Sequence, residues 1–254
     1  MLRLPKPLIV VLCLSAPAAM AEHTDALLLM DPTGSLVTGE YDLGSASVAS
    51  VNTRIYEGEF DAFFSTDEPG FNALGSAGSS GLPAGYTTLP GEKDVTFTAK
   101  TFAVEGQSAN LFHWDGVGLP AFAPVTDVSL HISKSPSLLF DISLTGADQD
   151  VAGFVIDTTG ADGFLHKHID FSLVANAGDP AAGFYAWSLS FTVDAIESWD
   201  VFFIHGAGIE NEPQHEAAID YFASNVVPEP ASLILMGLGL ATLWRRGSKN
   251  RLAD

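Results

Sequence analysis

The sequence predicts an all-β domain, an antiparallel β-sandwich or jelly roll, that forms a single unit over residues 22–225. Apolar and polar residues alternate over short runs rich in Phe, Val, Ile and Thr, which is typical of strands with one buried face. Gly, Asp and Pro interrupt these runs, as turns between strands require. Neither a repeat period nor a linker divides the segment, so its roughly 200 residues suit one domain.

The alternation predicts about nine or ten strands in this domain. Its clearest run places Tyr185, Trp187, Leu189, Phe191 and Val193 on one face. In chain order, the expected strands cover residues 26–30, 60–64, 95–104, 128–132, 137–142, 151–157, 164–173, 185–193 and 199–205. The Gly- and Pro-rich stretch 68–91 predicts a long loop, and residues 216–223 predict a short helix.

Residues 1–21 have the pattern of a secretory signal peptide. Basic residues precede an apolar run over 8–14, and Ala19 and Ala21 form the small-x-small pattern read by signal peptidase. The apolar run is far shorter than the ~20 residues that a membrane-spanning helix needs. We therefore expect export and cleavage before Glu22.

The composition of the mature chain excludes several kinds of chemistry. The only cysteine of the sequence, Cys13, lies in the expected signal peptide. The mature chain therefore has neither a disulfide nor a thiolate ligand. Residues 22–227 hold five Lys and Arg against 29 Asp and Glu. Such a surface repels phosphate backbones, so we expect no nucleic-acid partner and regard cations as the natural small ligands. The alternative is that the charge only keeps the protein soluble.

Residues 226–254 form a three-part tail. Pro228, Glu229 and Pro230 come first, an apolar run over 231–244 follows, and Arg245 and Arg246 begin a basic end. Fourteen helical residues span roughly 21 Å, against a hydrocarbon core of ~30 Å. The sequence thus predicts a short transmembrane helix, the protein's one contact with the membrane.

This tail resembles the PEP-CTERM sorting signal of Gram-negative bacteria. The resemblance implies recognition by an exosortase, a membrane cysteine transpeptidase-like enzyme, and removal of the tail near Pro228, Glu229 and Pro230. It also implies release or attachment at the cell envelope, in bacteria that make exopolysaccharide. The alternative is an ordinary carboxyl-terminal membrane anchor.

A His-x-His pair is the main candidate for chemistry. If residues 164–173 form one strand, His166, His168 and Asp170 share the face opposite Ile169 and Phe171. Two imidazoles at this spacing lie ~7 Å apart, near enough to bind one Zn²⁺ or Cu²⁺ ion with a third ligand from a neighbouring strand. The alternative is a pair of histidines that merely face solvent.

Three other histidines are candidate metal ligands. His131 faces outward from its strand and would supply the third ligand if that strand lies beside the His-x-His strand. His113 follows an apolar run next to a turn, and His23 would be the second residue of the mature chain, beside a free amine.

The phrase GFLHKHIDFSL at 163–173, followed by GFYAWSL at 183–189, is similar to a PEP-CTERM family whose genes are repressed by the zinc-uptake regulator. The phrase LFHWDG at 111–116 and an early histidine also fit, so the resemblance covers most of residues 22–224. It implies handling of zinc at the cell surface, with His166 and His168 as the positions carried over. This chain has fewer histidines than that family is expected to have, which argues against high zinc capacity or tight zinc affinity.

Signatures of serine hydrolases, zincins and P-loop nucleotidases are missing from the sequence. We therefore expect a binding protein and not an enzyme. The preferred interpretation is an exported envelope or matrix protein that binds a divalent metal such as zinc. The alternative is a structural or glycan-binding component of the exopolysaccharide matrix without a metal site.

Overall fold

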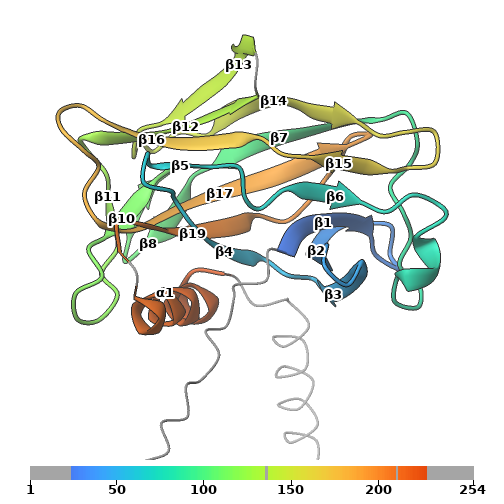
Figure 1. Ribbon diagram of the computed structural model, residues 1–254, viewed down its shortest axis with the longest axis horizontal. Coiled ribbons are helices and arrows are strands. Elements are labelled where there is room, and N and C mark those ends of the chain that lie inside the picture. The colour runs from blue at the N-terminus through green and yellow to red at the C-terminus, as the bar shows by residue number, and fades with distance from the viewer. Residues whose placement is uncertain (1–23, 135–136, 210, 228–254) are drawn as a thin grey trace, which may run out of the picture.

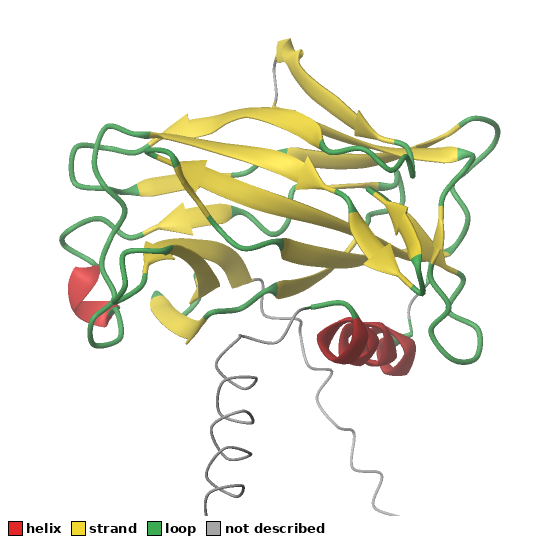
Figure 2. Ribbon diagram, turned by 180° about the vertical axis from the view of Figure 1, so that it is seen from behind, coloured by secondary structure: helices red, strands yellow, loops and turns green. Residues whose placement is uncertain are grey.

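The computed structural model describes residues 24–134, 137–209 and 211–227. Within these residues the chain forms 19 strands in four sheets, one α-helix and one 3-10 turn. The strands stack in layers, and helix α1 (Glu212–Asn225) lies against one side of the stack (Figures 1 and 2). The predicted mostly-β, sandwich-like architecture is confirmed.

The largest sheet has eight strands, and β17 (Gly183–Val193) is at its centre. This strand pairs with four others, and ten of its eleven residues are buried because both faces of the sheet are covered there. The rest of the sheet consists of β4 (Ile55–Glu59), β7 (Asp94–Lys100), β10 (Phe112–Trp114), β11 (Ala123–Pro124), β14 (Val151–Thr158), β18 (Ile196–Glu197) and β19 (Val201–Ala207).

Two smaller sheets cover one face of the large sheet. The five-stranded sheet has the order β15 (Leu165–Lys167), β6 (Phe71–Ala73), β1 (Thr24–Met30), β2 (Leu36–Asp42), β3 (Ser47–Val51). The four-stranded sheet has the order β13 (Ser137–Leu144), β12 (Val128–Lys134), β16 (Asp170–Ala175), β5 (Ser65–Thr66). The remaining elements are the hairpin β8 (Phe102–Val104) and β9 (Gln107–Ala109) and the 3-10 turn η1 (Ser79–Gly81).

The core follows from the alternation of side chains along β17. Tyr185, Trp187 and Phe191 point into the cluster beneath the two smaller sheets. Phe184 and Ala186 point the other way, into a second cluster covered by α1 and the β8–β9 hairpin. All described members of the hydrophobic clusters lie between Ala26 and Val227, so this body contains its own core.

Helix α1 is held against the large sheet by His215. Its Nε2 donates to the Ile204 carbonyl at 2.9 Å, and its Nδ1 lies 3.3 Å from Glu59 Oε1. Burial alone would lower the pKa of His215, but these two partners, aided by the negative charge of Glu59, raise it above its ordinary value. The contact is therefore strongest when the imidazole is protonated.

His205 is a buried polar residue in the middle of the core. Its ring centroid lies 4.7 Å from that of Trp187 and 5.5 Å from that of Phe60. Neither ring nitrogen has a hydrogen-bond partner among the described residues. Burial, with a smaller contribution from the charge of His215, lowers the pKa of His205 to about 3. This side chain is therefore neutral in the folded protein at physiological pH.

Several sequence-based expectations differ from the structure. The pairing is not entirely antiparallel, because β1 pairs with β6 and β4 with β19 in parallel. Residues 60–64 form a turn, in which Asp61 Oδ1 accepts from the backbone N–H groups of Phe63 and Ser65. The expected loop at 68–91 contains β6 and η1, the helix is longer than predicted, and β2, β3 and β4 were not predicted.

Candidate metal centre

The His-x-His segment crosses from one sheet to another. β15 pairs with β6 in the five-stranded sheet, whereas β16 pairs with β12 and β5 in the four-stranded sheet. The expectation of one strand over 164–173, with three metal ligands on one face, is therefore wrong. Asp170 lies opposite Ser133 at the start of β16 and belongs to neither His and carboxylate group found among the described residues. The strand ends because β6 has only three residues and offers no partner beyond Lys167.

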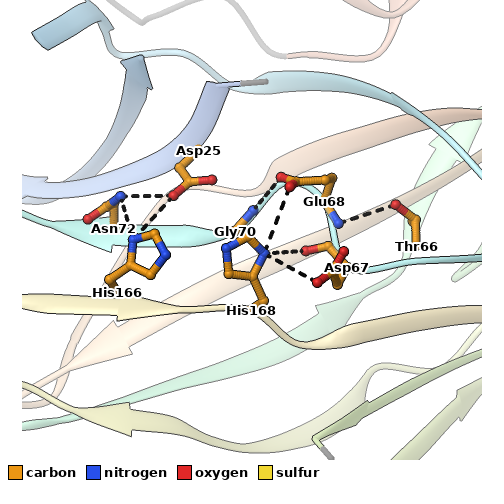
Figure 3. A network of polar contacts seen from close by, with 8 residues as sticks. All are labelled: Asp25, Thr66, Asp67, Glu68, Gly70, Asn72, His166 and His168. Atoms are coloured by element: carbon orange, nitrogen blue, oxygen red, sulfur yellow. Dashed lines mark hydrogen bonds and ion pairs between the residues drawn. The ribbon is translucent and has the colours of Figure 1, made fainter. Parts of the chain in front are cut away.

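The two imidazoles nevertheless converge. The ring centroids of His166 and His168 lie 5.2 Å apart, with an angle of 54° between the ring planes. Strand β1, which runs beside β6, brings Asp25 to the same place (Figure 3). Asp25, His166 and His168 each offer a ligand atom, and these three atoms lie within 4.8 Å of one another. A third candidate ligand is thus present, but it is Asp25 of β1, on the far side of β6 from β15, and not His131.

Asp25 is the most unusual member of this group because it is fully buried. Its Oδ2 accepts a hydrogen bond from the Asn72 amide at 2.8 Å and lies 3.6 Å from His166 Nδ1. Its Oδ1 has no hydrogen-bond partner in the described part of the chain. A buried carboxylate oxygen without a partner costs several kcal/mol, as an order of magnitude, unless a positive charge compensates it.

Gly70 leaves room for the two atoms that face each other across the site. A methyl group at Gly70 would lie 2.7 Å from His168 Nε2 and 2.8 Å from Asp25 Oδ1. Both distances are far below a van der Waals contact, so any side chain at this position would displace one of the two groups. The backbone N–H of Gly70 donates to Glu68 Oε2 at 3.2 Å, which ties the glycine to the neighbouring acidic loop.

The loop before Gly70 fixes the orientation of His168. Nδ1 of this histidine donates to the Asp67 carbonyl at 2.9 Å and lies 3.7 Å from the Asp67 carboxylate (Figure 3). A neutral imidazole that donates through Nδ1 carries its free lone pair on Nε2, the atom that faces Asp25. Asp67 and Glu68 form a second group with His168. Their carboxylates lie 3.7 and 4.0 Å from the donating Nδ1, the side on which groups beyond the ligands orient a histidine in metal sites.

Asn72 fixes the orientation of His166. Its amide nitrogen lies 2.8 Å from Asp25 Oδ2 and 3.1 Å from His166 Nδ1, so it holds these two side chains together (Figure 3). His166 is the most open member of the group, with 37% of its side chain exposed. The site is therefore closed by Asp25 and Asn72 on its inner side and open to solvent at His166.

The structure places two other predicted histidines elsewhere. His131 lies in β12, beside β16 and not beside β15, and its Nδ1 is 3.3 Å from Asp141 Oδ1. The Nε2 of His113 lies 3.1 Å from the Ala182 carbonyl, and burial lowers the pKa of this histidine. Neither joins a His and carboxylate group in the described ranges. The condition for His131, a strand beside the His-x-His segment of β15, is therefore not met, and neither histidine joins the group of Asp25, His166 and His168.

The remaining predicted sites lie outside the described residues. They are His23, the signal-peptidase positions Ala19 and Ala21, the Pro228, Glu229 and Pro230 segment, and the basic pair Arg245 and Arg246. The predicted transmembrane helix lies outside them too. Among the described residues, no helix has both the length and the apolar character needed to cross a membrane.

Asp25 was missed by sequence reasoning, although a signal for it exists. It directly precedes the four apolar residues Ala26–Leu29, all buried with it in β1. An acidic residue inside an otherwise apolar strand has to be compensated by a partner. The partner could not be identified without the pairing of β1, β6 and β15.

Comparison with known proteins places a family match at the carboxyl end. Residues 226–247 match the PEP-CTERM protein-sorting motif. Neither the curated proteins nor the solved structures include a significant match to the chain. The sorting motif predicted from the tail is thus confirmed, whereas the resemblance to the zinc-regulator-repressed family stays a prediction.

Proposed function

We propose that this chain, which carries a PEP-CTERM sorting motif and is thereby marked for export and exosortase sorting at the cell envelope, binds a divalent metal ion through Asp25, His166 and His168. The role is binding and not catalysis. We propose zinc as the ion, and the envelope or the surrounding exopolysaccharide matrix as the place where the protein acts.

The single observation that carries the metal proposal is the partnerless Oδ1 of a fully buried Asp25 beside two imidazoles. A protonated His166 could offset part of the charge, but its Nδ1 is 3.6 Å from Oδ2, beyond hydrogen-bond distance, and it does not reach Oδ1. A divalent cation would compensate the carboxylate and use the imidazole lone pairs at the same time.

The donor set favours zinc over calcium or magnesium. Two imidazole nitrogens and one carboxylate oxygen suit Zn²⁺, whereas Ca²⁺ and Mg²⁺ prefer shells of oxygen ligands. Copper is the main competitor, because Cu²⁺ binds the same donors more tightly in the usual affinity order. The choice of zinc thus rests on the two imidazole nitrogens and one carboxylate oxygen, and zinc is the first ion to test.

Zinc titration of residues 22–227 tests the proposal. We expect the parent to bind one equivalent of zinc and the His166→Ala/His168→Ala double variant to lose this binding. His131→Ala is the matched control, because this histidine pairs with a carboxylate outside the group. Equal affinity in the parent and the double variant would remove the assigned site.

The rival function is a glycan-binding matrix component, and one surface feature favours it. Trp199 is 54% exposed and forms one wall of a shallow notch with Asn52 and Arg54. The Arg54 guanidinium carbon lies 5.4 Å from the centre of the Trp199 ring. An exposed aromatic face of this kind can stack on a sugar ring. Retention on immobilised exopolysaccharide that is lost in Trp199→Ala, with zinc binding unchanged, would support this function as well.

A further inference from the structure

The open side of the metal group carries an exposed aromatic ring. Leu165 belongs to the core cluster beneath the small sheets, so its neighbours Phe164 and His166 point to the opposite face. Their Cα atoms are ~7 Å apart, since a strand rises ~3.3 Å per residue. The side chain of His166 is 37% exposed, and Phe164 is 50% exposed. Because β15 is an edge strand of the five-stranded sheet, that sheet does not cover them.

Three protein ligands leave a bound ion with a free position on this side. Zinc sites hold four ligands as a rule, and sites with three protein ligands keep the fourth position for water or a substrate. Asp25 is fully buried and accepts from the Asn72 amide, which closes the inner side of the group. A fourth ligand therefore reaches the ion from the side where His166 and Phe164 border solvent.

The charge of the metal-loaded group favours an anion at this position. The ion brings +2, Asp25 brings −1 and neutral imidazoles bring nothing, so a net charge of +1 is left over the group. The metal-free surface is negative instead, because residues 22–227 hold five Lys and Arg against 29 Asp and Glu. Asp67 and Glu68 lie directly beside His168. An anion is thus repelled by the metal-free protein and attracted once the ion is bound.

We infer that this free position takes the carboxylate of an external ligand whose ring packs on Phe164. The inference rests on the metal site proposed above. A carboxylate oxygen is a donor that Zn²⁺ accepts alongside imidazole, and its charge cancels the remaining +1. The Phe164 ring lies next along the strand and offers an apolar face to the body of such a ligand. This class of ligand includes free ring acids and the acidic sugar units of a polymer.

The test titrates Co²⁺-loaded residues 22–227 with galacturonate, and the Co²⁺ absorption reports the new ligand. Galactose, which lacks the carboxylate, and acetate, which lacks the ring, are the matched probes. Polygalacturonate distinguishes a polymer from a free acid as the source of the ligand. Phe164→Ala is the test variant. Its control is Phe63→Ala, which removes an 84% exposed ring from the turn before β5.

We expect galacturonate to change the Co²⁺ spectrum of the parent, whereas galactose should not, and metal-free protein should bind neither. Phe164→Ala should bind galacturonate roughly 3- to 10-fold more weakly, which is the contribution of one aromatic contact. Its affinities for acetate and for Co²⁺ should equal those of the parent, and Phe63→Ala should match the parent throughout. Polygalacturonate bound at least as tightly per sugar would identify a polymer as the ligand, and its exclusion would identify a free acid.

An unchanged Co²⁺ spectrum on addition of galacturonate would overturn this inference, as would equal galacturonate affinities in Phe164→Ala and the parent. Metal-dependent dimers in sedimentation velocity would also overturn it, because a carboxylate of a second copy would then hold the free position. Each of these results leaves the proposed function intact, because that depends on metal binding by the parent and its loss in the His166→Ala/His168→Ala variant.

Discussion

Replacing Asp25 with Asn tests whether this residue acts as a metal ligand or only as a structural partner of Asn72 and His166. The substitution keeps the shape of the side chain and an oxygen that can accept from Asn72, but removes the buried charge. Without metal, the parent carries a buried carboxylate oxygen, Oδ1, that has no hydrogen-bond partner in the described chain. We therefore expect metal-free Asp25→Asn to be within ~1 kcal/mol of the parent in free energy of unfolding, or more stable.

Zinc should act on the two proteins differently. At a free zinc concentration 100 times the dissociation constant, binding stabilises the folded state by ~2.7 kcal/mol. For a domain of about 200 residues, each kcal/mol raises the unfolding temperature by roughly 2–4 °C, so the parent should gain ~5–11 °C. Asp25→Asn at the same zinc concentration should gain less than ~2 °C, because its affinity falls.

Thermal unfolding of chelator-treated protein, followed by circular dichroism with and without zinc, measures both effects. Asp141→Asn is the control, since Asp141 is the exposed carboxylate that faces His131. The reasoning is refuted if metal-free Asp25→Asn loses more than ~3 kcal/mol while its zinc-induced shift equals that of the parent. That result would make the carboxylate a structural partner of His166 and Asn72.

Three further predictions concern other positions. Gly70→Ala should weaken zinc binding at least ~10-fold in the zinc titration, because the added methyl group would lie against His168 Nε2 and Asp25 Oδ1. The control is Gly81→Ala, which has open space around it and should leave the zinc affinity unchanged. The lowered pKa of His205 makes the unfolded state take up a proton between pH 6.5 and about 3. The free energy of unfolding should then fall by up to ~1.4 kcal/mol per pH unit on acidification, and urea unfolding of His205→Phe should lack this part of the slope. Because the pKa of His215 is raised in the folded state, its protonation stabilises the fold below pH 6.5, and this stability is lost as pH rises through the folded-state pKa. Glu59→Gln should flatten this loss in the same urea experiment. An unchanged dependence of the free energy of unfolding on pH would contradict the role of the ion pair.

The parts of the fold that sequence reasoning predicted are those with a strong local pattern. β17 was predicted because its alternation extends over nine of its 11 residues, 185–193. β2 and β4 have glycine inside them, and β3 is rich in serine, so their polar pattern resembles a loop. β2 and β4 form strands because β1 and β19 offer them partners, and β3 pairs in turn with β2. This pairing is a property of the tertiary structure and not of the local sequence.

The candidate site also has a part that the sequence predicted and a part that it did not. His166 and His168 were found from their spacing, although the strand expected to carry them ends at Lys167. Asp25 lies about 140 positions away and meets them only because β6 pairs with both β1 and β15. A short strand in the middle of a sheet thus decided the ligand set, and nothing in its three residues indicated this.

Helix α1 ends directly before the sorting motif begins. The backbone N–H groups of Val226 and Val227 both donate to the Phe222 carbonyl, and the sorting motif begins at Val226. An enzyme that cuts near Pro228 would have to work within ~4 Å of chain from the last residue packed on the body. Processing and folding would therefore compete for the same few residues, and a variant that loosens this end should be trimmed faster than one that tightens it.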